Sequence, residues 1–228
     1  MNIELYYCIP AYNEENNILN CLRSLAEQDI ELKTETIICL NGCTDNTYIV
    51  IEEAKKKYPK LNIRTIHSEK GISFAHNAII RNVANRYVPL VFVDADVTLD
   101  GKCVGILFEE ISALDQLIAV GGWPVPSKFK NMNIVEKFLF SVLHVRAFYP
   151  ESEVSTNNVT SFKTYVEKYP QPEVEPAFEN RSKIYFHGRI FMLRNAGYFE
   201  MPEDKALADD TYLPNMIHTI YGPGTIRI

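Results

Sequence analysis

Two aspartates separated by one residue are the feature of this sequence that most directly suggests chemistry. Asp94 and Asp96 flank Ala95 and follow the apolar run 88–93. If that run is a buried strand, both carboxylates lie at its end and can face the same side. Two anions held this close need compensation, and Mg²⁺ or Mn²⁺ prefers such hard oxygen ligands while it bridges to substrate phosphates. The spacing predicts a divalent-metal site, and a capped turn is the alternative.

A second acidic pair, Asp209 and Asp210, lies near the start of a helix expected at residues 206–218. Carboxylates at the N-terminus of a helix are favoured by the helix dipole and commonly act as caps. Burial raises the pKa of a carboxyl group, and a carboxylate tuned in this way can act as a general base near neutral pH. The pair therefore has two interpretations, a helix cap and a catalytic base.

The elements that must position these residues alternate along the first half of the chain. Short apolar runs predict strands at residues 3–9, 36–40, 61–67, 88–93 and 117–120. Helical periodicity predicts helices at residues 14–28, 45–58, 73–86 and 101–115. This alternation indicates an α/β fold with a mostly parallel sheet that is covered by helices on both faces.

Polar clusters follow four of these strands. They are Pro10-Ala11-Tyr12-Asn13-Glu14, Asn41-Gly42-Cys43-Thr44-Asp45, Lys70-Gly71 and Asp94-Ala95-Asp96. Because ligands of parallel sheets bind beyond the carboxyl ends of the strands, the four clusters are expected to converge on one edge. Turn and cap chemistry alone explains each cluster taken singly.

Beyond residue 123 the regular alternation stops. An apolar helix is expected at residues 131–149, a long loop at 150–182, a strand at 183–193 and a strand at 225–228. The apolar helix has three interpretations: core, a dimer face, or a surface helix that meets a lipid-linked acceptor. Core is the preferred one.

Composition excludes several classes of protein. The chain has 228 residues, of which 46% are hydrophobic and 23% charged, as in one soluble globular domain. Its net charge of −6 and the lack of a long basic run argue against nucleic acid as a partner. The five cysteines include no C-x-x-C pair, which indicates reduced thiols and a cytoplasmic protein. No apolar run reaches the length of about 18 residues that a membrane-spanning helix needs.

Five ordered segments resemble family 2 glycosyltransferases, which are inverting enzymes with a GT-A type fold that binds a nucleotide sugar. The segments are residues 9–15, 41–47, 70–78, 92–96 and 207–210. The resemblance implies a three-layer α/β/α architecture with a mostly parallel central sheet. It also implies a single domain, 1–228, in which residues 1–123 bind the nucleotide sugar and residues 124–228 hold the acceptor and the catalytic base.

The resemblance assigns roles to the two acidic pairs. The first loop and the D-x-D segment would hold a nucleoside diphosphate, with Asp96 as the direct metal ligand and Asp94 as a contact to the ribose and the metal shell. A divalent ion there assists the departure of the negatively charged diphosphate. Asp210 matches the base of the family and Asp209 the acid before it, and a base opposite the leaving group gives inversion.

Two positions depart from the family pattern where it reads the nucleobase. Asn41 stands where paired aspartates are common, and His76, next to Asn77, stands where an arginine is usual. A neutral amide can donate as well as accept, and a histidine is only partly charged near neutrality. A UDP-linked sugar is the default donor.

Three further residues belong to the predicted site. Trp123 is a candidate to stack on a sugar ring, with a core aromatic as the alternative. His187 and Gly188 lie where the family forms its acceptor wall. The chain lacks the Q-x-x-R-W motif of processive members, which argues against a polymerising synthase.

The leading hypothesis is therefore metal-dependent, inverting and non-processive transfer of one sugar to a hydroxyl acceptor, either a saccharide or a lipid-linked one. The alternatives are a sugar-phosphate nucleotidyltransferase and a nucleotide-sugar-binding domain without transfer activity. The first usually carries a Gly-rich basic N-terminal loop, whereas the segment at residues 10–15 is acidic. The expected location is the cytoplasm, with peripheral contact at the inner face of the membrane as a variant, and the oligomeric state is left open.

Overall fold

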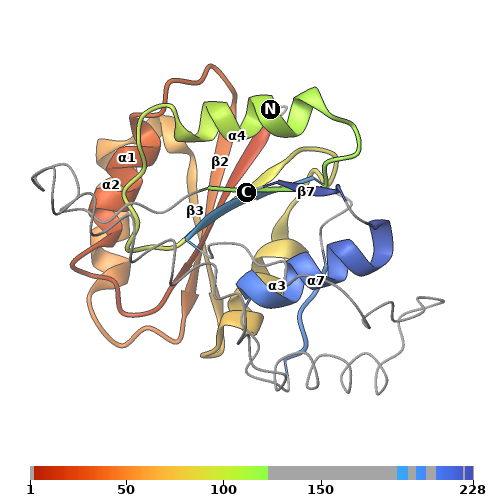
Figure 1. Ribbon diagram of the computed structural model, residues 1–228. Coiled ribbons are helices and arrows are strands. Elements are labelled where there is room, and N and C mark those ends of the chain that lie inside the picture. The colour runs from red at the N-terminus through yellow and green to blue at the C-terminus, as the bar shows by residue number, and fades with distance from the viewer. Residues whose placement is uncertain (1–2, 123–188, 195–198, 204–208, 223, 228) are drawn as a thin grey trace, which may run out of the picture. The chain divides into compact units, whose positions relative to one another are not determined.

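The computed structural model describes residues 3–122, 189–194, 199–203, 209–222 and 224–227 (Figure 1). These residues belong to one compact unit, which spans Met1–Trp123 and Ile184–Ile228. The apolar helix and the long loop expected between residues 131 and 182 lie outside the described residues, as do Trp123, His187 and Gly188. The single-domain organisation stays a prediction.

A seven-stranded sheet forms the centre of the described unit, with the strand order β3-β2-β1-β4-β6-β5-β7. The strands are β1 (Leu5–Ala11), β2 (Thr34–Asn41), β3 (Ile63–Ser68), β4 (Leu90–Val93), β5 (Ala119–Gly121), β6 (Ile190–Leu193) and β7 (Ile226–Arg227). β1 pairs in parallel with β2 and β4, and β2 pairs in parallel with β3. β6 is antiparallel to both of its neighbours, β4 and β5. The sheet is thus mostly parallel, as predicted.

Helices cover both faces of this sheet. They are α1 (Ile18–Ala26), α2 (Thr47–Lys57), α3 (Ile72–Asn82), α4 (Cys103–Ala113) and α7 (Asp209–Tyr221), with a short 3-10 helix at Pro59–Leu61. The main hydrophobic core joins α1, α2 and α4 to one face. Figure 1 shows α4 on one side of the sheet and α3 and α7 on the other. The predicted three-layer α/β/α fold is confirmed.

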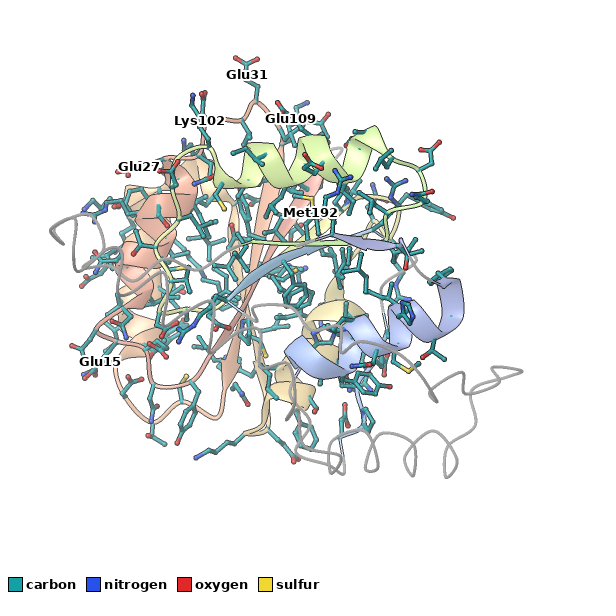
Figure 2. The ribbon with its side chains drawn as sticks, in the orientation of Figure 1. Glu15, Glu27, Glu31, Lys102, Glu109 and Met192 are labelled. Carbon is teal, nitrogen blue, oxygen red and sulfur yellow. The ribbon has the colours of Figure 1, made fainter. Side chains whose placement is uncertain are left out.

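β1 illustrates why these strands read as continuous apolar runs. Leu5, Tyr7 and Ile9 belong to the core beneath α1 and α2, whereas Tyr6 and Cys8 alternate with them and are equally buried. A strand that is covered on both faces has no side exposed to solvent, so apolar residues occupy both sets of alternating positions. Figure 2 shows the same arrangement further along the sheet, where Met192 of β6 points toward α4.

β1 ends two residues later than the sequence predicted, so Pro10 and Ala11 lie within the strand and not in the following loop. Tyr6 donates its backbone N–H to the Pro89 carbonyl on the β4 side of the strand. Pro10 lies four residues further on, so its backbone nitrogen faces the same side. Pairing between β1 and β4 ends at Cys8 with Phe92, so the missing N–H of Pro10 falls where no ladder bond is made. The proline is therefore tolerated in a central strand.

The longest helix among the described residues is α7, with 13 residues. No helix in this described part of the chain has the length and apolar character needed to cross a membrane.

Candidate active site

The loops that follow β1, β2, β3 and β4 meet at one edge of the sheet. These four strands are parallel neighbours, so their carboxyl ends lie side by side. Figure 2 shows Glu15, from the loop after β1, at this edge, and Glu27 and Glu31 at the opposite edge. The four predicted polar clusters thus converge, although Pro10, Ala11 and Ala95 contribute mainly backbone because the first two belong to β1 and Ala95 is buried.

The first two loops are fastened together by Asn13. Its side-chain oxygen accepts a 2.8 Å hydrogen bond from the backbone N–H of Thr44, and its amide donates to Thr44 Oγ1 at 3.2 Å. Asn13 has a φ of 55°, a left-handed conformation that asparagine tolerates better than most residues. The neighbouring N–H of Glu14 donates to Thr47 Oγ1 at 2.7 Å. In this structure the Asn13 side chain holds the loop after β1 against the loop after β2.

Asp45 completes the junction of these loops. Its carboxylate accepts hydrogen bonds from the backbone of Glu15 at 3.1 Å and from the backbone and hydroxyl of Thr47 at 3.0 and 2.6 Å. Desolvation opposes ionisation, yet the hydrogen bonds outweigh it and lower the pKa of Asp45. In the other direction, the Glu15 carboxylate accepts a 2.9 Å hydrogen bond from the backbone N–H of Asn46. The acidic residues of this junction hold the loops in place.

Tyr12 and Lys70 form the exposed contact of the first and third loops. The ammonium of Lys70 donates to Tyr12 Oη at 2.7 Å and lies 4.2 Å from the centroid of the tyrosine ring. Gly42 permits this approach, because a Cβ at its position would lie 3.0 Å from the Lys70 Cβ and its φ is 67°. An exposed aromatic ring beside a cation is suited to a planar, anionic ligand such as a nucleotide.

Asn41 fixes the start of the third loop. It is 6% exposed, and its side-chain oxygen accepts a 2.7 Å hydrogen bond from the backbone N–H of Gly71. Gly71 has a φ of 141°, which favours glycine. The expectation that Asn41 reads a nucleobase stays a prediction, while the observed contact gives it a role in loop geometry.

His76 and Asn77 are both buried on α3, with 1% exposure each. His76 stacks on Phe92 with ring centroids 4.5 Å apart, and its Nε2 lies 3.2 Å from the carbonyl oxygen of Phe199. Burial lowers the pKa of His76 to about 4, so the ring is neutral near pH 7. The expectation that His76 reads a nucleobase stays a prediction, while the structure shows a buried, neutral ring.

Asn77 holds the chain segment that approaches the second acidic pair. Its amide donates to the carbonyl of Met201 at 2.7 Å and to Glu203 at 3.0 Å. Asp209 and Asp210 are the first two described residues of α7 (Asp209–Tyr221), and residues 204–208 lie outside the described part of the chain. The backbone places them at its N-terminus, and their side chains lie outside the described part.

Asp94 and Asp96 follow β4 as expected, and β6 brings Arg189 to them. The Arg189 carbonyl accepts the backbone N–H of Asp94 at 3.1 Å. Its guanidinium Nη1 lies 3.0 and 2.9 Å from the two carboxylate oxygens of Asp96. This ion pair, together with the charge of Asp94, raises the pKa of Arg189.

The donor set of this segment fits a divalent ion only in part. Among the described residues, no group of three or more His, Cys, Asp or Glu side chains is placed to hold a metal. Two carboxylates are nevertheless what Mg²⁺ or Mn²⁺ commonly takes from a protein when substrate phosphates and water supply the remaining ligands. Asp94 and Asp96 are therefore compatible with a substrate-bridged ion, and in this structure Asp96 is paired with Arg189.

Arg189 is the residue of this site whose pairing the sequence did not reveal. It precedes a short apolar run, which gives no sign of the strand that it will lie beside. Only the antiparallel register of Val93 with Ile190 sets Arg189 opposite Asp94. A prediction of strand pairing between residues nearly one hundred positions apart would have been needed.

Comparisons with known proteins agree with this arrangement. The poly(ribitol-phosphate) beta-glucosyltransferase of Bacillus spizizenii is 27% identical over 172 residues, which cover 69% of this chain and 26% of that protein. Three other curated relatives are covered to 22%, 16% and 38% of their length, so the chain spans only part of the relatives it matches.

Two solved structures share the fold over almost the whole chain. Staphylococcus aureus TarS 1–349 in complex with UDP has a TM-score of 0.62 at 18% identity, covering 99% of this chain and 58% of that one. The mannosyltransferase PcManGT of Pyrobaculum calidifontis, in complex with GDP-Man and Mn²⁺, has a TM-score of 0.63 at 17% identity, covering 95% and 52%. The sequence model of glycosyl transferase family 2 matches residues 6–168, which is well over half of the chain. With the converging strand-end loops, this match shows that the chain belongs to glycosyl transferase family 2.

Proposed function

We propose that this chain transfers one sugar from a nucleotide diphosphate sugar to a hydroxyl acceptor. The observation that carries the proposal is the convergence of four strand-end loops, which brings Tyr12, Lys70 and the Asp94-Ala95-Asp96 segment to one edge of the sheet. Family membership supports transfer and weighs against a nucleotidyltransferase. The donor complexes of TarS with UDP and PcManGT with GDP-Man support a nucleotide-linked sugar without selecting the base.

The proposed donor lies across the four loops. The ring of Tyr12, 39% exposed, offers a stacking surface for the base, and Lys70 offers a charge to the diphosphate. UDP remains the default carrier. The interlocked contacts of Asn13 and Asp45 keep the loops ordered before the donor arrives, which reduces the entropy lost on binding.

Asp94 and Asp96 would hold Mn²⁺ or Mg²⁺ against the diphosphate. Bound there, a divalent ion neutralises the charge that develops on the leaving diphosphate. The Mn²⁺ in the PcManGT complex supports divalent-metal use in this fold. Without a divalent ion, the negative charge of this segment would disfavour the binding of the phosphates.

Asp210 is the proposed base, which takes the proton of the acceptor hydroxyl as the oxygen attacks the anomeric carbon. The C1–O bond to the diphosphate breaks on the opposite face, so the configuration inverts. Asp209 precedes it at the N-terminus of α7, where the helix dipole favours both carboxylates. Trp123 is proposed to stack on a sugar ring, and His187 and Gly188 are proposed to contribute to the acceptor wall. The proposed acceptor is a saccharide or a lipid-linked alcohol.

Calorimetric titration tests the donor site. We expect UDP or GDP to bind in Mn²⁺ and to bind much more weakly in a chelator. Asp96→Asn should remove most of the affinity gained from Mn²⁺, because it removes a charged ligand. Asp29→Asn is the matched control, since Asp29 is exposed on the connection between α1 and β2. Equal nucleotide affinity with and without metal, unchanged in Asp96→Asn, would disprove the metal site.

Analysis of the products tests the reaction class. Slow Mn²⁺-dependent hydrolysis of a nucleotide sugar to sugar and nucleoside diphosphate is expected of a transferase that lacks its acceptor. Release of pyrophosphate from a nucleoside triphosphate and a sugar phosphate would instead indicate a nucleotidyltransferase. Donor binding without turnover, in the presence of a panel of saccharide and polyprenyl-phosphate acceptors, would indicate a binding domain.

A further inference from the structure

Arg189 presents a cation to the carboxylate that is expected to bind a metal. Its Nη1 contacts both oxygens of Asp96, at 3.0 and 2.9 Å, so the guanidinium covers the face of the carboxylate that a metal ion would use. Both side chains are partly exposed, Arg189 to 52% and Asp96 to 41%. The pair is therefore accessible and not locked in the core.

The backbone holds Arg189 in this place independently of its side chain. Val93 pairs with Ile190 in the antiparallel ladder, and the Arg189 carbonyl accepts the N–H of Asp94 at 3.1 Å. Movement of the guanidinium thus requires only rotation about side-chain bonds. The long side chain keeps its charge near the loop edge after it leaves Asp96.

We propose that Arg189 neutralises Asp96 while no metal is bound. When a divalent ion binds Asp96, the Arg189 side chain moves and its guanidinium forms an ion pair with the donor diphosphate instead. The inference rests on the proposed function, because it assumes a diphosphate and a metal at this edge. It adds a positioning residue that balances the charge of the site in both states.

The physical argument is a competition between two cations for one carboxylate. A divalent ion needs an oxygen at about 2.0–2.2 Å, and a guanidinium that covers both oxygens opposes this by contact and by repulsion. Ion pairs at partly exposed positions are weak, so a divalent ion can displace the arginine. The released guanidinium then matches a phosphate group, which it can bind through two N–H donors.

Binding of Mn²⁺ without nucleotide, followed by electron paramagnetic resonance, is the first measurement. Arg189→Gln should bind Mn²⁺ about threefold to tenfold more tightly than the wild type, because its competitor and a positive charge are gone. A purely structural role of Arg189 would give the opposite change. Arg189→Lys keeps the charge without the planar fork and should fall between the two.

Arg64→Gln is the matched control for loss of one arginine charge. Arg64 is also ion-paired, with Glu35 at 2.7 Å, but it lies near the amino end of β3, at the opposite edge of the sheet. Its removal leaves one uncompensated carboxylate, as removal of Arg189 does. Arg64→Gln should bind Mn²⁺ as the wild type does.

Titration of UDP and GDP in saturating Mn²⁺ is the second measurement. Here Arg189→Gln should bind the nucleotide about tenfold more weakly, because the diphosphate loses a charge-assisted contact. Tighter metal binding together with weaker nucleotide binding is the expected signature. Mn²⁺ affinity in Arg189→Gln that equals or falls below that of the wild type would overturn the inference, as would unchanged nucleotide affinity.

The two measurements separate this inference from the proposed function. If the wild type binds nucleotide with Mn²⁺ and Arg189→Gln matches it in both measurements, the donor site stands and the role of Arg189 is wrong. If Mn²⁺ binds more tightly to Arg189→Gln but neither protein binds a nucleoside diphosphate, Arg189 does compete with Mn²⁺ for Asp96. The proposed contact of Arg189 with the diphosphate and the proposed donor are then both wrong. Absence of Mn²⁺ binding to either protein, with or without nucleotide, overturns both.

Discussion

Asn77 and Met201 form a reciprocal pair of hydrogen bonds between a side chain and the backbone. The Asn77 amide donates to the Met201 carbonyl at 2.7 Å, and the Met201 N–H donates to Asn77 Oδ1 at 2.7 Å. Both residues are buried, with 1% and 3% exposure. Because Asn77 lies on α3 and Met201 precedes α7 in the chain, the pair ties α3 to the segment at residues 199–203.

The first prediction concerns this pair. Asn77→Asp keeps the acceptor for the Met201 N–H but places a carboxylate against the Met201 carbonyl and against Glu203, which accepts from Asn77 at 3.0 Å. We expect a loss of about 2 to 4 kcal/mol in the free energy of unfolding, measured with urea. Asn82→Asp is the control, because Asn82 is exposed and its hydrogen bonds with other described residues are made within α3 and to Arg64. An equal loss in both variants would show that the Met201 contact is not the cause.

The second prediction is a loss of stability in mild acid. The pKa of His76 is lowered by burial from 6.5 to about 4, so the unfolded chain takes up this proton first as the pH falls. The contribution of neutral His76 is complete above pH 6.5 and is lost as the pH falls toward 4, amounting to about 3 kcal/mol. Urea denaturation at pH 7 and pH 4.5 should reveal the loss.

Other groups also titrate in this range, so the comparison needs variants. His76→Gln retains a donor for the Phe199 carbonyl and cannot titrate, and its stability should change less between the two pH values than that of the wild type. His67→Gln is the control, since His67 is exposed on β3. The same pH dependence in the wild type and in both variants would exclude His76 as the cause.

The third prediction separates the loop role of Asn41 from a role in reading the base. Asn41→Ala leaves the Gly71 N–H without its acceptor and should cost about 1 to 3 kcal/mol of stability. Asn41→Asp keeps an acceptor at the N-terminus of α3 and should stay within about 1 kcal/mol of the wild type. Asn46→Ala is the control, because the Asn46 side chain makes no capping hydrogen bond. Competition of UDP, GDP, CDP and dTDP on Asn41→Asp should leave their ranking unchanged, and a new preference for uracil would show that Asn41 faces the base.

The sequence was sufficient for the part of the fold that depends on local periodicity. Apolar runs bounded by polar turns located β1 to β4, and the parallel arrangement then placed their polar ends at one edge. The ends of the elements were less certain, because tertiary pairing decides them. Pro10 shows this: it resembles a strand terminator, yet it fits within β1 because pairing with β4 has already stopped.

The side-chain environment of the site was not predictable from spacing alone. His76 occupies a position that the family pattern links to the base, but the packing of α3 against Phe92 turns its ring into the core. Arg189 shows the reverse case, since the antiparallel pairing of β4 with β6 brings it to Asp96, a contact that the sequence did not indicate. Motif spacing gives the order of residues along the chain, whereas helix rotation and strand register decide which of them meet.

The last prediction assigns the base to one member of the second acidic pair. Asp210→Asn preserves the size of the side chain and removes its basicity, so transfer should slow by about two to four orders of magnitude. Nucleotide affinity in Mn²⁺ should stay within about twofold of the wild type, because a base that acts on the acceptor contributes mainly in the transition state. Asp209→Asn is the matched control, with the same change of charge one residue earlier in α7. Because both variants lose one negative charge at the same helix N-terminus, a dipole effect alone would lower transfer equally in the two. If Asp209→Asn carries the whole loss, or if Asp210→Asn transfers sugar at nearly the wild-type rate, the base is not Asp210.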